Sequence, residues 1–370
     1  MLKRVVNQVE QRPVARDKQA TARRESIEIA GVHVKAGTRQ SIDIPLPSFY
    51  THSSASIPIH VVHGRQPGPC LLVSAALHGD ELNGVEIVRR LLAHKQIDKI
   101  KGTLIAIPVV NVFGFVSKSR YLPDRRDLNR SFPGSETGSL AARLANIIMT
   151  EVIPHCTHII DLHTGAVHRE NLPQIRAMLS DAPVTEGMAR AFGVPVILNS
   201  ELLEGTFRMA ASNHDIPVLL YEGGEALRFD EFAIRAGLNG VLRVMSHLDM
   251  RRKSRKTSPV NCLIANASQW LRAQQSGILR SLVATGTQVE EGDVLAYIND
   301  PLGENSEQLI SPVSGIVIGK TNLPLVFEGE AIFNIARYEA ADEISDHIEA
   351  YQEEHHPLTD NSDSDEPPLV

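Results

Sequence analysis

Histidine and acidic side chains follow three apolar segments of this chain, a pattern that suits metal binding. His78 and Glu81 follow CLLVSAAL, His163 follows THIIDL, and Glu222 follows IPVLLY. In open α/β sheets, chemistry collects beyond the carboxyl ends of the strands. If the three segments are strands of one sheet, these four side chains meet at one edge. Gly79 would free the backbone to bend His78 and Glu81 around a single ion.

Two histidines and one carboxylate with an open fourth position make a catalytic zinc site. We therefore predict His78, Glu81 and His163 as the ligands of one zinc ion per chain. Any one of these histidines alone is more often a packing residue, and the coincidence of three strand ends favours ligation. Asp161 lies two residues before His163, on the same strand face, where it would orient the imidazole. Glu222 is the predicted acid/base that takes a proton from the metal-activated water.

An arginine-rich segment without helical or strand period, RYLPDRRDLNRSFPG, covers residues 120–134. Asn129 and Arg130 in this loop offer amide donors and a guanidinium fork, which suit carboxylate recognition and oxyanion stabilisation. For Arg125 and Arg126, the alternative is a surface loop held by exposed ion pairs.

Apolar segments alternate with segments of helical period in the first two thirds of the chain. We expect strands at residues 26–34, 56–64, 70–77, 103–111, 157–163, 194–199 and 216–222, and helices at 80–94, 139–153 and 232–248. Almost wholly apolar strands that alternate with helices indicate an α/β domain with a covered sheet, at least partly parallel. We assign this domain to residues 26–250.

The sequence pattern changes in residues 261–337, where short apolar segments are separated by glycine and proline. This pattern predicts a small all-β domain. Its two halves repeat a pattern: Gly277, Val289, Gly292 and Leu295 correspond to Gly315, Val326, Gly329 and Ile332. The repeat resembles a biotinyl/lipoyl-type sandwich. The turn that joins the halves, residues 299–305, contains no lysine, so we expect a structural or lid-forming module without a prosthetic group.

Composition limits the remaining possibilities. The chain has 370 residues, of which 42% are hydrophobic and 22% charged, as in ordinary globular proteins. No apolar run is long enough for a membrane span, and the N-terminus lacks a signal-peptide pattern, so we expect a cytoplasmic location. Three distant cysteines suggest neither a disulfide framework nor a cysteine zinc cluster.

The net charge of -7 is concentrated at one end. Residues 340–370 contain ten Asp or Glu and no Lys or Arg, which leaves 37 basic and 34 acidic residues elsewhere, a balance of +3. Without a basic face, nucleic acid is not an expected partner. We expect residues 1–25 to be a flexible arm, 251–260 a basic solvated linker, and 338–370 an acidic tail, largely disordered, with one short helix at 341–354. The sequence leaves open whether the chain forms a homo-oligomer.

Four motifs in the order HGDELNG, DLNRSFPG, DLHTG and YEGGE resemble the succinylglutamate desuccinylase/aspartoacylase family of zinc carboxypeptidase-like hydrolases. The resemblance covers about residues 26–337 and implies a carboxypeptidase-like mixed sheet with flanking helices, followed by a smaller β domain at the site entrance. It implies zinc binding by His78, Glu81 and His163, with Glu222 as general base and acid. It also implies substrate contacts from Asn129, Arg130 and, shortly before them, Arg120. Better-known members carry HGNE where this chain has HGDE.

The leading hypothesis is a zinc-dependent deacylase that cleaves the amide bond of an N-acyl amino acid or related small carboxylate. Zinc with Arg120 or Arg130 would hold the oxyanion, and Glu222 would protonate the leaving amine. One alternative is a metallocarboxypeptidase acting on short peptides. A second is a non-catalytic zinc-binding module of the same fold, which loss of a ligand or base would favour, and none is lost. The absence of G-x-S-x-G disfavours serine-hydrolase chemistry. The acyl group, the amine and cleavage of esters are left open.

Overall fold

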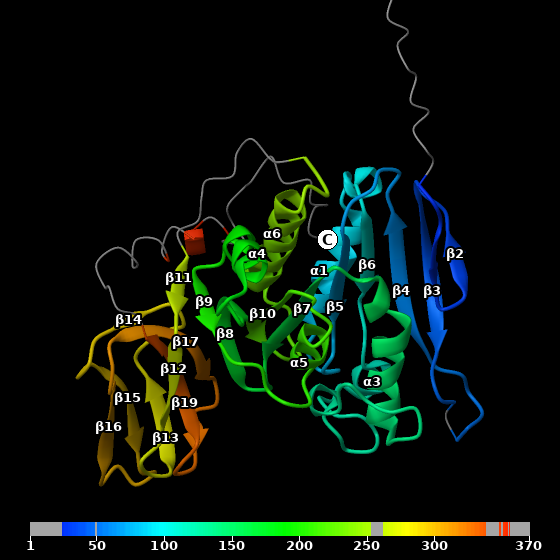
Figure 1. The fold of residues 1–370 in the computed structure, drawn as a ribbon. Coiled ribbons are helices and arrows are strands. Elements are labelled where there is room, and N and C mark those ends of the chain that lie inside the picture. Colours follow the sequence, from blue (N-terminus) through cyan, green and yellow to red (C-terminus); the bar gives the residue numbers. More distant parts are fainter. Residues whose placement is uncertain are drawn as a thin grey trace, which may run out of the picture.

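The computed structural model describes residues 24–48, 50–252, 262–337, 348, 351–353 and 355. The predicted arm, basic linker and acidic tail therefore lie almost entirely outside the described residues. One 13-stranded mixed sheet runs through the molecule, with the strand order β12-β19-β17-β8-β10-β7-β5-β6-β4-β3 and with β9, β11 and β14 paired beside this path (Figure 1).

The first ten strands belong to the α/β part of the chain. They are β1 Ile27–Ile29, β2 Val32–Val34, β3 Thr38–Pro45, β4 Ser56–His63, β5 Cys70–Ala75, β6 Thr103–Ile107, β7 His158–Gly165, β8 Arg169–Ala177, β9 Val196–Asn199 and β10 Val218–Glu225. Strands β6, β5, β7 and β10 are successive parallel neighbours. β4 is antiparallel to β3 and β6, and β8 is antiparallel to β10 and β17 but parallel to β9. The predicted sheet is thus present and partly parallel, and β3 and β8 are additional strands.

Six α-helices and three short 3₁₀ segments connect these strands within the described residues. They are α1 Asn83–Ala93, α2 Val112–Ser117, α3 Leu140–Glu151, α4 Pro183–Phe192, α5 Phe207–Ser212, α6 Glu231–His247, η1 Ile97–Lys99, η2 Leu128–Arg130 and η3 Ile153–His155. The three predicted helices correspond to α1, α3 and α6. None of the helices described has the length and apolarity needed to cross a membrane.

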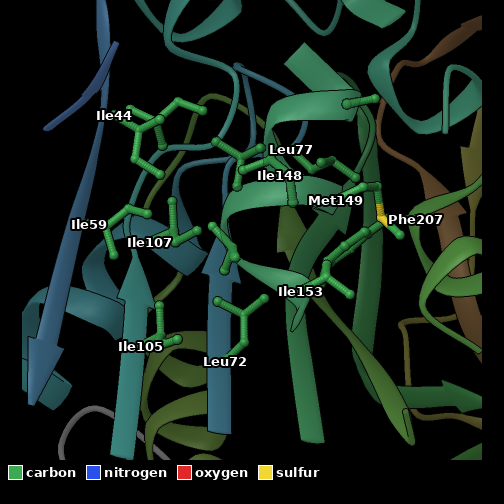
Figure 2. Packing of buried hydrophobic residues seen from close by; sticks show 14 of the residues in the cluster. Ile44, Ile59, Leu72, Leu77, Ile105, Ile107, Ile148, Met149, Ile153 and Phe207 are labelled. Carbon is green, nitrogen blue, oxygen red and sulfur yellow. The ribbon is translucent and has the colours of Figure 1, made fainter. Parts of the chain in front are cut away.

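Strand alternation divides the core into two layers, one on each face of the sheet. Leu72 of β5 belongs to the same layer of buried side chains as Ile148 of α3 and Phe207 of α5 (Figure 2). Its neighbours Leu71 and Val73 point the other way and pack in the cluster that holds α1, α4 and α6. Because both faces are covered, the central strands are largely apolar.

The same alternation places the polar side chains. Ile159 of β7 and Val218 of β10 belong to the layer beneath α3 and α5. Asp161 and His163 continue the row of Ile159, and Glu222 continues the row of Val218, because side chains two apart share a face. The candidate site therefore opens on the α3/α5 side of the sheet.

The C-terminal region is all-β, as predicted. Its strands are β11 Leu263–Ala265, β12 Ala267–Arg272, β13 Gly277–Ser281, β14 Gln288–Val289, β15 Val294–Asn299, β16 Ser306–Ile310, β17 Gly315–Thr321, β18 Leu325–Val326 and β19 Ala331–Arg337. The two halves exchange their short strands: β14 pairs with β17 through Val289 and Gly315, and β18 pairs with β13 through Val326 and Gly277. The predicted sequence repeat is therefore a repeat in the strand pairing.

The C-terminal region is joined to the α/β part by strand pairing. β17 lies antiparallel to β8, with Gly319 opposite Asn171 and Thr321 opposite Arg169. Side-chain hydrogen bonds add to the junction: Thr285 Oγ1 donates to Glu170 Oε1 at 2.6 Å, and Gln174 Nε2 donates to the carbonyl of Ile318 at 3.0 Å. The large sheet is thus continuous across both regions.

Candidate active site

His78, Glu81 and His163 lie together beyond and at the ends of β5 and β7. One donor atom from each lies within 4.8 Å of the others, and all three residues are buried. The Glu81 carboxylate sits between the imidazoles, with Oε1 2.7 Å from His78 Nδ1 and Oε2 2.8 Å from His163 Nδ1. Each histidine thus turns the same nitrogen toward one shared carboxylate.

The loop between β5 and α1 fixes two members of this cluster. His78 follows the strand, and α1 begins at Asn83, so Glu81 lies just before the helix. A Cβ on Gly79 would lie only 1.9 Å from the backbone carbonyl carbon of Gly114 in α2. The glycine is required by this close approach, since its φ lies outside the left-handed region. This is a different reason from the bending that the sequence suggested.

Two aspartates contact the outer nitrogens of the imidazoles. Asp161 Oδ2 lies 2.7 Å from His163 Nε2, and its other oxygen accepts a hydrogen bond from Ser74 Oγ at 2.7 Å. Asp127 Oδ1 lies 3.2 Å from His78 Nε2. A carboxylate on the outer nitrogen fixes the orientation of a ligand imidazole and raises its basicity. Asp161 was predicted for this position and Asp127 was not, although Asp127 begins the DLNR motif.

The charges in the cluster suit a cation. Burial alone would raise the pKa of Glu81, but His78 and His163 beside it hold that pKa well below its usual range. Burial opposes charge on His163, yet Asp161 and Glu81 raise its pKa well above the ordinary value. The pKa of His78 is raised against burial by Glu81 and Asp127. Two nitrogens and one carboxylate in a buried, anion-rich surrounding match the donor set of a zinc site.

Glu222 lies on the strand next to the cluster. It is paired with His163 across β10 and β7, and its side chain is 14% exposed. Asn171 Nδ2 donates a hydrogen bond of 2.9 Å to Glu222 Oε2, while Arg176 Nε lies 3.9 Å from Oε1. The structure therefore brings Glu222 beside the His-Glu-His cluster without including it among the close donor atoms.

The arginine-rich loop lies against the same cluster. Arg120 donates from Nε and Nη2 to Asp127 Oδ2 at 3.1 and 2.9 Å, and its Nη1 lies 3.6 Å from Glu81 Oε1. Asn129 is buried, and its Oδ1 accepts from the backbone N–H of Phe207 at 2.9 Å, so part of this amide anchors α5. Arg130 is exposed, and its Nη1 donates to the Asn129 carbonyl at 2.6 Å.

Arg208 is a partly buried cation that the sequence reasoning missed. It donates to Ser200 Oγ and to the Glu201 carbonyl, each at 2.7 Å. Burial and the neighbouring Arg176 lower its pKa to about 10, against the opposing effect of Glu222. Two guanidinium groups near one carboxylate leave a surplus of positive charge, which an anionic ligand would neutralise. A single arginine in the short helix α5 gave no periodic signal that could have identified it.

Comparisons with known proteins identify the family of this chain and agree with its fold. Residues 67–248 match the family model of the succinylglutamate desuccinylase/aspartoacylase catalytic domain. An N-alpha-acetyl-L-2,4-diaminobutyric acid deacetylase from Halomonas elongata is 30% identical over 269 residues, which cover 66% of this chain and 74% of the relative. The chain belongs to the succinylglutamate desuccinylase/aspartoacylase family, whose members are amide-bond deacylases.

Solved structures show the same fold. A succinylglutamate desuccinylase/aspartoacylase from Rhodobacter sphaeroides superposes with a TM-score of 0.73 at 24% identity, covering 82% of this chain and 96% of that one. The product-bound ectoine utilization protein EutE (DoeB) from Ruegeria pomeroyi also has a TM-score of 0.73, at 21% identity, with coverages of 81% and 95%.

Proposed function

We propose that this protein is a zinc-dependent deacylase that hydrolyses the amide bond of an N-acyl amino acid or a related small carboxylate. The observation that carries the proposal is the buried His78–Glu81–His163 cluster with Glu222 on the adjoining strand, in a chain of a deacylase family. The deacetylase from Halomonas elongata supports an acylated amino acid as the substrate class.

His78, Glu81 and His163 would hold the zinc ion, and Asp127 and Asp161 would orient the two imidazoles. When bound there, zinc supplies Lewis-acid activation of the amide carbonyl and of water. The three ligands come from two strand ends of a rigid sheet, so their spacing is set by the fold.

Glu222 is the proton-transfer residue. Its carboxylate takes a proton from the attacking water as the new C–O bond forms, and delivers a proton to the amine nitrogen as the C–N bond breaks. Arg120 or Arg130 would hold the negative charge that develops on the carbonyl oxygen. Arg120 lies nearer the cluster, whereas Arg130 is exposed in the loop and reaches solvent.

Two partly buried arginines favour an anionic substrate. Arg208, next to Arg176 and close to Glu222, offers a guanidinium fork for the carboxylate of an amino acid, with Asn129 and Arg130 as further contacts. Pairing with a carboxylate would offset the desolvation of Arg208. These contacts favour a small acidic substrate bound beside the proton-transfer residue.

The two regions have different tasks in this proposal. Residues 26–250 form the hydrolase domain, and residues 261–337 form a biotinyl/lipoyl-like sandwich, which the exchange of β14 and β18 between the halves supports. The joining turn at residues 299–305 has no lysine, so the sandwich is a structural module and carries no prosthetic group.

The function is tested by a deacylation screen of zinc-loaded protein. N-acetyl, N-succinyl and N-formyl amino acids, including Nα-acetyl-2,4-diaminobutyrate, are compared with short peptides. We expect hydrolysis of at least one N-acyl amino acid. Release of C-terminal residues from peptides, without deacylation, would contradict the proposal.

The matched control separates base from ligand. Glu222→Gln keeps the side-chain shape and removes the base, so zinc should stay bound while kcat falls by about 10²–10⁴-fold. Glu81→Gln replaces an anionic ligand by a neutral one and should weaken zinc binding itself. Full activity of Glu222→Gln on a confirmed substrate would show that the mechanism is wrong.

A further inference from the structure

Asn171 connects the proposed proton-transfer residue to the C-terminal β region. It lies on β8 and is buried, and its Nδ2 donates to Glu222 Oε2 at 2.9 Å. On its other side is Gly319 of β17, the residue paired with Asn171 across the junction of the two regions. One side chain thus contacts the catalytic strand while its backbone pairs with the C-terminal module.

Glu222 has few other restraints. The strand pairing of β10 shifts register directly after Glu222, on the sides facing both β7 and β8. Arg176 Nε, at 3.9 Å, is beyond hydrogen-bond distance. Among the residues that the structure describes, the amide of Asn171 gives the Glu222 carboxylate its hydrogen bond. This donor fixes one carboxylate oxygen and leaves Oε1 for proton transfer.

Gly319 sets the place of that amide. A Cβ built on Gly319 would lie 2.7 Å from Asn171 Oδ1, a separation at which one of the two atoms must shift. The Glu170 carbonyl and Asn334 Cβ are next nearest, at 3.4 and 3.7 Å. The φ of Gly319 is outside the left-handed region, so the glycine is there for space. The absence of a side chain at Gly319 therefore leaves room for the Asn171 amide.

We propose that Asn171 is a positioning residue for Glu222, and that the C-terminal β region supports it through Gly319. The inference rests on the proposed role of Glu222 in proton transfer. It gives the β region a part in organising the reaction centre in addition to any part in covering it.

Two substitutions at residue 171 separate positioning from packing. Asn171→Asp keeps the shape but replaces the N–H donor by an oxygen that repels Glu222, and Asn171→Ala removes the group. Because hydrogen bonds to charged groups contribute roughly 1.5–3 kcal/mol, we expect kcat to fall about 10- to 100-fold in both, with KM and zinc content unchanged. A purely structural residue would tolerate Asn171→Asp, so wild-type kcat in that variant would overturn the proposal.

The contribution of the β region is tested at Gly319. Gly319→Ala should push the Asn171 amide and lower kcat, and the double variant Gly319→Ala/Asn171→Ala should be no slower than Asn171→Ala alone. Thr285→Val is the matched control, since it removes a junction hydrogen bond to Glu170 that does not involve Glu222. Additive losses in the double variant, or an equal loss of kcat in Thr285→Val, would show that the junction acts only through general stability.

A structural readout is independent of activity. A crystal structure of Asn171→Asp should show the Glu222 carboxylate displaced and β8 and β17 still paired. The Glu222→Gln background distinguishes the two proposals. If Glu222→Gln is inactive and Asn171→Asp is fully active, only this inference fails. If Glu222→Gln is fully active, the proposed role of Glu222 in proton transfer is wrong, and the inference about Asn171 loses its basis. Relative to the low residual kcat of Glu222→Gln, adding Asn171→Ala should have no further effect.

Discussion

The edge where β5, β7 and β10 end and the junction between β8 and β17 are built by different means. At the strand ends, ionisable side chains from distant segments meet within hydrogen-bond distance, as Glu81 does with His78 and His163. At the junction, backbone pairing and a glycine hold the elements together, and the side chains that cross are mostly neutral amides and hydroxyls. Ionisable side chains supply the chemistry at the strand ends, and backbone geometry sets the position of side chains at the β8/β17 junction.

The energetic consequences of a substitution should differ accordingly. Removing one partner of a buried charged cluster leaves the others uncompensated, which costs about 3–5 kcal/mol and affects function directly. Removing one neutral hydrogen bond at the junction costs about 1 kcal/mol. The comparison therefore predicts large effects at the strand ends and small ones at the junction, except where a junction residue contacts Glu222.

The largest effect is expected for His163→Ala. This change removes one zinc ligand and leaves Glu81 and Asp161 buried without their shared partner. We expect zinc to be absent by metal analysis and deacylation to fall to background. His78→Ala should behave alike. Stoichiometric zinc in both variants would show that the cluster is not the metal site.

Arg208→Met tests whether Arg208 binds the carboxylate of the substrate. If Arg208 binds the substrate carboxylate through charge-assisted hydrogen bonds, its loss should lower kcat/KM by about 10²–10³-fold, with zinc retained. Arg190→Met is the matched control, because among the described residues the hydrogen bonds of this exposed arginine of α4 go to Glu186 and Cys262. Steady-state kinetics of both variants measure the difference, and equal kinetics would remove Arg208 from the proposed site.

Asp161→Asn should have an intermediate effect. The amide keeps the volume but weakens the hold on His163 Nε2, so we expect zinc affinity or activity to fall about 10- to 100-fold. Competition with a chelator measures the affinity. Ser74→Ala, which removes only the hydrogen bond to the other oxygen of Asp161, should have a smaller effect. Equal effects of Ser74→Ala and Asp161→Asn would contradict the prediction that the contact between Asp161 and His163 matters more than the hydrogen bond from Ser74.

Zinc stabilisation should depend on pH in a defined direction. The pKa of His163 is raised in the folded protein, so its proton stabilises the metal-free form at low pH, and this contribution is lost as pH rises through that raised pKa. Zinc needs the neutral imidazole and replaces the proton. The increase in Tm on adding zinc should therefore be larger at about pH 8 than at about pH 6. Thermal melts with and without zinc test this, and the reverse order would contradict it.

The sequence predicted the strand ends better than the junction for a physical reason. Apolar segments followed by His78, Glu81, His163 and Glu222 could be recognised from residue type alone, and the structure brings these residues together. The orientation of β8 could not be predicted, because Pro173 and several charged residues disfavour a central strand. In the structure, Pro173 lies where β8 leaves β17 and begins to pair with β9, so its missing N–H interrupts no ladder.

The same limit applies to residues whose role depends on packing. Arg208 lies in a helix of six residues, and only its position near Arg176 and Glu222 in the folded protein marks it. Gly319 and Asn171 have no periodic or motif signal, because their contact depends on the register between β17 and β8. A pairing register between distant strands cannot be deduced from the local pattern of either strand.

The smallest effect is expected for Asn322→Ala, which compares two asparagines of one junction. Asn322 Nδ2 donates to Glu225 Oε2 at 3.0 Å, as Asn171 does to Glu222, but Glu225 has no proposed part in the reaction. The backbone bond from Asn322 N to the His168 carbonyl, 2.8 Å, would survive. Because Asn322 is exposed, water can replace its hydrogen bond to Glu225, and we expect the free energy of unfolding to fall by only about 1 kcal/mol with kcat unchanged. Denaturant unfolding and kinetics of the same preparation measure both. A loss of kcat as large as that of Asn171→Ala would mean that the junction affects the reaction centre as a whole, and the distinction drawn between the two asparagines would be wrong.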